Sequence, residues 1–116
     1  PYGVLLLPPI SENDELAALC RTLGVRYVRM GSAPLDAPQH MVASNDREAV
    51  RGAVEYLIGI GHRRIGLVAG PHGFRSAAER RAGFEDALAG AGLTVPRSMI
   101  AEGNYTFATG MVAAER

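Results

Sequence analysis

The fold class is decided by one stretch of the chain, which reads Arg64-Ile65-Gly66-Leu67-Val68-Ala69-Gly70-Pro71-His72-Gly73. Its first six residues are largely apolar and predict a buried strand, and the Gly/Pro-rich end predicts a turn. Ser76 to Glu79 then match a capping box, which predicts a helix that ends at Gly92. A strand, a loop and a helix in this order form the repeating unit of α/β folds.

The same pattern repeats on both sides of this stretch. Apolar runs predict strands over residues 4–7, 25–30, 41–43, 64–69 and 99–105. Capping residues predict helices that begin at Ser11, Asn45, Ser76 and Thr109, and glycines predict ends for the first three at Gly24, Gly61 and Gly92. The run 4–7 does not alternate, so we expect it to be buried on both faces, as in a parallel sheet. The sequence predicts an α/β fold with parallel strands joined by right-handed crossovers.

Composition excludes several function classes. Twelve Lys plus Arg balance twelve Asp plus Glu in 116 residues, so this segment has no positive field that would attract nucleic acid. The single cysteine, Cys20, excludes an internal disulfide, and its apolar helical stripe predicts an inert buried thiol. No apolar run is long enough to span a membrane. The chain begins without Met and ends on an uncapped helical pattern, so we expect both ends to be cuts through a longer polypeptide.

A ligand of an open α/β sheet binds beyond the carboxyl ends of the strands, which here points to the loops 8–11, 31–46, 70–76 and 103–109. Arg80 lies on the apolar stripe of its predicted helix, where its guanidinium could hold ligand hydroxyls or a carboxylate. The alternative is a surface pair with Glu79 or Asp86. Asp46, at the start of a helix, could contact a ligand or only favour the helix dipole.

Two aromatic residues lie in these loops. Tyr105 could stack on a sugar ring or belong to the core, whereas Phe74 in its Gly/Pro-rich loop favours a pocket wall. The three histidines are far apart in sequence and have no Cys or carboxylate partners at ligand spacing, so no metal site is expected. No dinucleotide or phosphate-loop fingerprint and no nucleophile elbow is present. We therefore expect no catalytic residues and no cofactor.

A longer pattern carries a family resemblance. It comprises Glu55-Tyr56-Leu57-Ile58-Gly59-Ile60-Gly61-His62-Arg63-Arg64-Ile65-Gly66-Leu67-Val68-Ala69-Gly70-Pro71, then Glu79-Arg80-Arg81-Ala82-Gly83-Phe84, Ala91-Gly92-Leu93 and Gly103-Asn104-Tyr105-Thr106-Phe107-Ala108-Thr109-Gly110. This pattern resembles the effector-binding domain of LacI/GalR transcriptional regulators over essentially the whole chain. The resemblance implies a type I periplasmic-binding-protein-like fold with two doubly wound lobes of parallel sheets. Both lobes would be incomplete here, with residues 1–61 in the N-terminal lobe and 62–116 in the C-terminal lobe.

The resemblance also implies a site and partners. Arg80 matches the effector-contacting arginine, Phe74 and Ser76 match pocket positions before it, and Tyr105 matches an aromatic pocket position. The usual Asp-Asn pair appears inverted as Asn45-Asp46, and Pro9 matches a loop position of the opposite lobe that offers no side-chain hydrogen bond. A complete member would be a cytoplasmic homodimer that binds operator DNA through an N-terminal helix-turn-helix absent from this chain.

Three functions fit the sequence. The first is a sensor whose small-molecule effector, a sugar by preference with nucleobases left open, changes operator binding. The second is a periplasmic sugar-binding protein of a transporter, against which the Gly-His-Arg-Arg-Ile stretch argues. The third is an enzyme on the same scaffold, for which the chain supplies no catalytic set.

Overall fold

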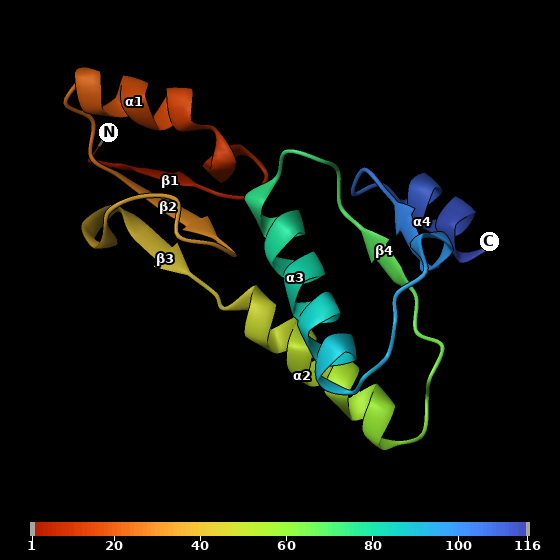
Figure 1. The fold of residues 1–116 in the computed structure, drawn as a ribbon. Helices are drawn as coiled ribbons and strands as arrows, with labels where there is room; N and C mark the ends of the chain where they lie inside the picture. Colours follow the sequence, from red (N-terminus) through yellow and green to blue (C-terminus); the bar gives the residue numbers. More distant parts are fainter. Residues whose placement is uncertain (1, 116) are drawn as a thin grey trace. The chain divides into compact units, whose positions relative to one another are not determined.

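The computed structural model describes residues 2–115 and divides the chain into two compact units, Pro1–Asn45 and Asp46–Arg116 (Figure 1). Both units combine helices with parallel strands, as the sequence predicts. The predicted lobe boundary lies at residue 61, whereas the helix over 46–59 belongs to the second compact unit. How the residues divide between the lobes of a complete domain stays a prediction.

The first unit is a three-stranded parallel sheet. Its elements are β1 (Val4–Leu6), η1 (Ile10–Glu12), α1 (Asp14–Thr22), β2 (Tyr27–Gly31), η2 (Pro38–His40) and β3 (Met41–Ala43). The strand order is β1-β2-β3, with Leu5 opposite Val28 and Met30 opposite Val42. The loops that follow β1 and β2 therefore leave the sheet at the same edge, because the strands are parallel.

One face of this sheet carries the core of the first unit. Leu6 and Tyr27 pack there against Ala17 and Cys20 of α1, so the predicted buried thiol is confirmed. The prediction that the first strand is buried on both faces is wrong for this chain, because Leu5 on the other face is 57% exposed. The reason is that Ala17 and Cys20 of α1 pack on the face of the sheet that carries Leu6 and Tyr27, so α1 does not cover the face that carries Leu5.

The start of α1 also differs from the prediction. The N-cap is Asn13, whose Oδ1 accepts a hydrogen bond from the Leu16 N–H at 3.0 Å, and not Ser11. Ser11 lies instead in the short η1 turn and is fully buried. The extra 3-10 turn moves the helix start by two to three residues, and Asn is as good a cap as Ser.

A buried arginine holds the loops of the first unit together. Arg29 is 1% exposed, and its guanidinium donates to the carbonyls of Ser11 and Leu35 at 2.7 and 3.0 Å. It also pairs with Asp14 at 2.8 Å and with Asp36 at 3.4 Å. These bonds satisfy the buried charge and tie the segment after β1 to the segment after β2.

Asp36 is the carboxylate at the centre of this network. Its lowered pKa predicts that the folded protein loses stability in acid. Burial raises the pKa of Asp36, but hydrogen bonds from Tyr27, the Ala37 N–H and Arg29 together with the Arg21 charge outweigh it and hold the pKa below the ordinary 3.8. A lowered pKa in the folded state adds stability above the ordinary pKa, and this contribution is lost as the pH falls through the folded value.

We therefore expect Asp36→Asn to lower the thermal midpoint at pH 7 and to flatten the loss of stability below about pH 4. Thermal unfolding of the complete protein between pH 3 and pH 7 measures both effects. The control is Glu15→Gln, an exposed carboxylate on α1, which should follow the unchanged protein. Parallel pH curves for Asp36→Asn and the unchanged protein would contradict the expectation.

The second unit pairs two long helices with a two-stranded sheet. Its elements are α2 (Asp46–Gly59), β4 (Leu67–Ala69), α3 (Arg75–Gly90), η3 (Arg97–Met99), β5 (Ile100–Glu102) and α4 (Phe107–Ala114). The strands β4 and β5 are parallel, with Leu67 opposite Ile100 and Ala69 opposite Glu102. The predicted strands 64–69 and 99–105 are longer than this, because pairing is limited to three residues on each strand.

The core of the second unit lies where α2 and α3 pack side by side (Figure 1). Val54 of α2 meets Phe84, Ala87 and Leu88 of α3, and all four are at least nine-tenths buried. Gly83 permits this contact, because a Cβ there would lie 2.2 Å from the Arg47 carbonyl oxygen of α2. The two helices therefore touch backbone to backbone at Gly83.

Two predicted caps of this unit are wrong. The residue before α3 is Phe74, which makes no side-chain cap bond, and Ser76 lies inside the helix with its hydroxyl near Tyr105. The cap of α4 is Thr106, whose Oγ1 accepts from the Thr109 N–H at 3.3 Å. The predicted helix stop at Gly92 is confirmed, since Gly92 follows the last turn of α3 with a φ of 67°.

None of the helices within residues 2–115 is both long and apolar enough to cross a membrane.

Candidate functional site

The candidate site lies in the second unit, at the carboxyl ends of β4 and β5. The loop after β4 runs from Gly70 to Phe74 and leads into α3, and the loop after β5 runs from Gly103 to Thr106 and leads into α4. Parallel strands bring these two loops to one edge of the sheet. Side chains of α3, of the start of α2 and of both loops meet there.

The first pair at this edge is ionic. The Arg80 Nε donates to the Asp46 Oδ2 at 2.6 Å and joins α3 to the start of α2. The Asp46 side chain is 18% exposed and the Arg80 side chain 43%, so the pair is open to solvent on the arginine side. Neither Glu79 nor Asp86 is the partner that the structure gives Arg80, and Asp86 pairs instead with Arg47 at 2.7 Å.

The second group is aromatic and polar. The rings of Phe74 and Tyr105 meet edge to face with centroids 5.8 Å apart. The Tyr105 hydroxyl lies 3.5 Å from the Ser76 hydroxyl. Ser76 and Arg80 are four residues apart on α3 and therefore share one face of the helix. The structure thus gathers five of the predicted residues at one edge, namely Asp46, Phe74, Ser76, Arg80 and Tyr105.

Pro9 and Asn45 belong to the first compact unit. Pro9 is exposed and precedes the η1 turn, after a cis Pro8-Pro9 bond. Asn45 is exposed and precedes α2 by one residue. Their role as effector contacts stays a prediction.

Tyr105 is presented by a backbone conformation that tyrosine seldom adopts. Its φ is 64°, in the left-handed region that disfavours bulky side chains. The neighbouring turn is held by Asn104, whose Oδ1 accepts from the Thr106 and Thr109 hydroxyls at 2.5 and 2.9 Å. Strained residues of this kind persist only where their surroundings fix them, and they concentrate at functional sites.

Sequence reasoning missed Asn104 and Gly70 as parts of this site. The hydrogen bonds of Asn104 depend on the folded turn, although Asn before a helix-capping Thr is a usable signal for such a turn. Gly70 allows the Tyr105 ring to approach the backbone, since a Cβ on Gly70 would lie within 2.7 Å of three ring and hydroxyl atoms. The sequence gives Gly70 only as a turn residue.

Gly70→Ala is expected to displace the Tyr105 ring with little loss of stability, because the clash is with the far end of a flexible side chain. Aromatic contacts contribute about 0.5–1.5 kcal/mol, so effector affinity should fall about threefold to tenfold. Calorimetric titration of the complete protein measures this change. Gly110→Ala is the matched control, because its Cβ would meet nothing within 4 Å. Equal affinities for both variants would remove Tyr105 from the site.

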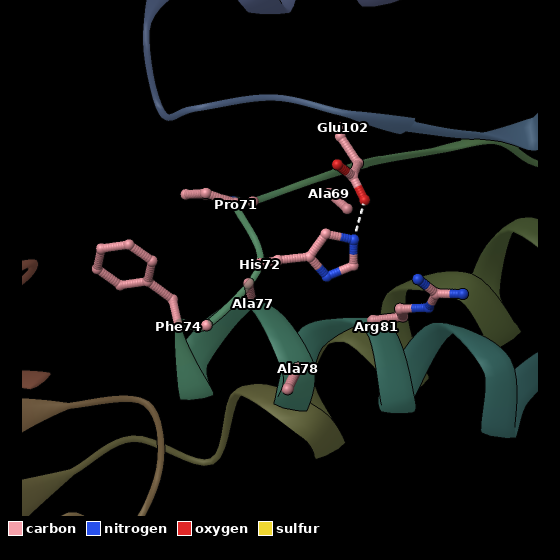
Figure 2. Close-up of a pocket in the computed structure, with 10 residues that line it drawn as sticks. Ala69, Pro71, His72, Phe74, Ala77, Ala78, Arg81 and Glu102 are labelled. Carbon is pink, nitrogen blue, oxygen red and sulfur yellow. Dashed lines mark ion pairs between the residues drawn. The ribbon is translucent and has the colours of Figure 1, made fainter.

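A small cavity lies beside these residues, under the loop after β4 (Figure 2). Its volume is about 120 Å³, and its lining combines the 69–74 segment with Ala77, Ala78 and Arg81 of α3 and Glu102 of β5. The His72 imidazole points across it to Glu102, with which it forms an ion pair when protonated. Of the predicted residues only Phe74 lines this cavity, so it is a neighbour of the site and not its centre.

The side chains gathered at this edge are suited to binding a ligand and do not form a catalytic set. Arg80 and Asp46 offer a donor fork and a carboxylate with no net charge, and Tyr105 and Phe74 offer ring surface. Among residues 2–115 no cluster of three or more His, Cys, Asp or Glu side chains could hold a metal ion. These groups suit a polar ligand with several hydroxyls and an apolar ring face.

Comparison with known proteins defines the class. The family model described as a periplasmic binding protein-like domain matches residues 54–116, which is more than half of the chain. The parallel α/β units agree with this class, since open α/β sheets bind ligands at the carboxyl ends of their strands. The chain belongs to this family and is part of the effector-binding domain of a LacI-family transcriptional regulator.

The relatives are consistent with this assignment. The chain is 35% identical over 114 residues to the HTH-type transcriptional regulator CelR of Thermobifida fusca, covering 96% of this chain and 33% of CelR. It is 31% identical over 111 residues to the ribose operon repressor of Escherichia coli K12, covering 96% and 34%. The chain therefore spans about a third of the length of these relatives.

Solved structures agree in fold. A CelR–cellobiose complex matches with a TM-score of 0.83 and 33% identity over 98% of this chain and 35% of that chain. A transcription regulator from Lactobacillus plantarum matches with a TM-score of 0.85 and 28% identity over 99% and 43%. The relatives and solved structures named here are all transcriptional regulators or repressors.

Proposed function

We propose that this chain is the sensing part of a LacI-type regulator whose effector is a neutral sugar. The complete protein would be a cytoplasmic homodimer that binds operator DNA through a helix-turn-helix outside this chain. Effector binding would change the relative orientation of the lobes and so the affinity for the operator. The coupling free energy in such systems is typically about 1–3 kcal/mol and is reciprocal between effector and operator.

The observation that carries the proposal is the Arg80–Asp46 pair at 2.6 Å beside Ser76 and Tyr105. An arginine bound to a carboxylate is held in orientation, and its remaining N–H groups and the carboxylate can together hold vicinal hydroxyls. The ring of Tyr105 adds the aromatic face on which sugars stack. All these groups occur at one strand edge, where α/β domains bind ligands.

The charge of the pair favours a neutral effector over an acidic one. A uronate or a sugar phosphate would place a second anion close to the Asp46 carboxylate, and like charges at short range destabilise each other. A neutral sugar meets no such repulsion. The CelR relative was solved with cellobiose, and another relative is a ribose operon repressor, which supports a sugar in this chain as well.

The test uses the complete protein and its own promoter DNA. Operator affinity is measured by fluorescence anisotropy alone and with cellobiose, ribose, glucuronate or adenine. We expect one of the neutral sugars to change the operator affinity by about fivefold or more, which corresponds to the usual coupling. A response to glucuronate or adenine alone would contradict the proposal of a neutral sugar. If the complete protein binds no DNA specifically, the proposal that it is a transcriptional regulator is wrong.

A further inference from the structure

A separate cavity lies at the opposite end of β4 and β5 from the candidate site. Its volume is about 330 Å³, which is within the range of small-molecule pockets. It is formed by the segment before β4, the segment before β5 and the carboxyl end of α3.

The lining combines an apolar wall with polar groups. Leu88 is 2% exposed and belongs to the core of the second unit, against which Ile65 and Leu93 also pack. Thr94 and Ser98 contribute hydroxyls, and both residues are exposed. A ligand here would place an apolar part against the wall and a polar part toward solvent.

The charges around this cavity are all positive. Arg63 and Arg64 line it, and no Asp or Glu does. The cavity under the loop after β4 differs in this respect, because Glu102 lines it together with Arg81. Two guanidinium groups without a carboxylate among the lining residues favour an anionic ligand group.

The two arginines differ in their hydrogen bonds. The Arg63 Nη1 donates to the carbonyls of Ile58 and His62 at 2.8 and 3.0 Å, so this side chain is held at the end of α2. Cations are favoured at such a helix end, which accounts for Arg63. Arg64 has no hydrogen bond or ion pair to any residue in the described range 2–115, so its five donors are available.

We propose that this cavity binds a small organic anion, with a carboxylate or phosphate on Arg64 and a short apolar body against Leu88, Leu93 and Met99. This site is distinct from the Arg80–Asp46 edge, because α3 runs from Ser76 and Arg80 at one end to Leu88 near the other. The regulator thus carries a second ligand site for a chemically different class of metabolite.

Hexyl phosphate and hexanoate are the probes, titrated into the complete protein by calorimetry. Inorganic phosphate controls for the anion without an apolar body, and hexanol for the apolar body without charge. We expect hexyl phosphate or hexanoate to bind with a Kd of about 1 mM, the order for a ligand of this size, and both controls to bind at least tenfold more weakly.

Two variants make the test specific. Arg64→Gln should weaken binding of the anionic probe at least about tenfold, because a charge-assisted contact is lost. The exposed Arg26→Gln in the first unit should leave it unchanged. Sugar binding should be the same in Arg64→Gln as in the unchanged protein, which separates this site from the effector site. Equal binding of hexanol and hexyl phosphate, no effect of Arg64→Gln, or no saturable binding of either anion would overturn the proposal.

Discussion

Arg80→Ala in the complete protein is expected to weaken effector binding at least about tenfold, since a hydrogen bond to a charged group contributes about 1.5–3 kcal/mol. Two contacts would be lost, because the donors of Arg80 disappear and Asp46 loses the partner that orients it. The ligand-free protein should lose little stability, since partly exposed ion pairs contribute at most about 1 kcal/mol. Calorimetric titration with the responding sugar and ligand-free thermal unfolding measure the two effects.

The second unit supplies a matched control for this variant. Arg47 and Asp86 form another ion pair between α2 and α3, at 2.7 Å, with both side chains more exposed than Asp46. Hydrogen bonding to Arg47 lowers the pKa of Asp86, so both partners stay charged at neutral pH. Arg47→Ala removes an interhelical pair without touching the site. We expect its sugar affinity to be unchanged, and an equal loss in both variants would mean that Arg80 acts only through helix packing.

Gly83→Ala is expected to destabilise the protein by about 1–3 kcal/mol, the usual range for overpacking at a tight contact. The new Cβ would lie 2.2 Å from the Arg47 carbonyl oxygen and 3.0 Å from its carbonyl carbon. Because these are backbone atoms of α2, no side-chain rotation relieves the clash, and the two helices must move apart. The core contact between Val54 and Phe84 would loosen with them.

The control for Gly83 is another helical glycine. Gly52 lies inside α2, and a Cβ there meets nothing within 4 Å. Gly52→Ala should therefore stabilise the protein by about 0.5–1 kcal/mol through helix propensity alone. Thermal or urea unfolding of both variants gives opposite signs if the helices touch at Gly83. Stabilisation by both substitutions would show that the helices are not in contact there.

Hydrophobic periodicity was sufficient to predict most of the fold. The helix containing Val54 and the helix containing Phe84 were predicted within a few residues, because their apolar stripes follow the helical period. Parallel pairing was predicted from the alternation of strands and helices. The prediction that Leu5 is buried is wrong. Periodicity predicts that a segment is an apolar strand, but which of its faces is covered depends on helices elsewhere in the chain.

The helix caps show where local patterns lose to tertiary structure. Ser76 and Glu79 have capping-box spacing, but the Ser76 hydroxyl lies near Tyr105, 29 residues away, and the helix begins one residue earlier. Ser11 and Asn13 are both good caps by residue type, and only the intervening 3-10 turn decides between them. A sequence pattern offers the candidates, and long-range packing selects among them.

The candidate site was predicted as a set of residues but not as a geometry. The α/β rule for strand ends and the family resemblance both indicated Arg80, and the structure shows which carboxylate it pairs with. Asp46 is 34 residues away in sequence, so helical spacing alone could not identify the pair. The approach of Tyr105 to Gly70 depends in the same way on the packing of two loops.

The most direct test is a crystal structure of the complete protein with the sugar that changes operator affinity. We expect sugar oxygens within hydrogen-bond distance of the Arg80 guanidinium and the Asp46 carboxylate, about 2.7–3.2 Å, with a ring face against Tyr105. A sugar bound elsewhere, with the Arg80–Asp46 pair still at 2.6 Å and without contact to it, would show that this pair does not hold the effector.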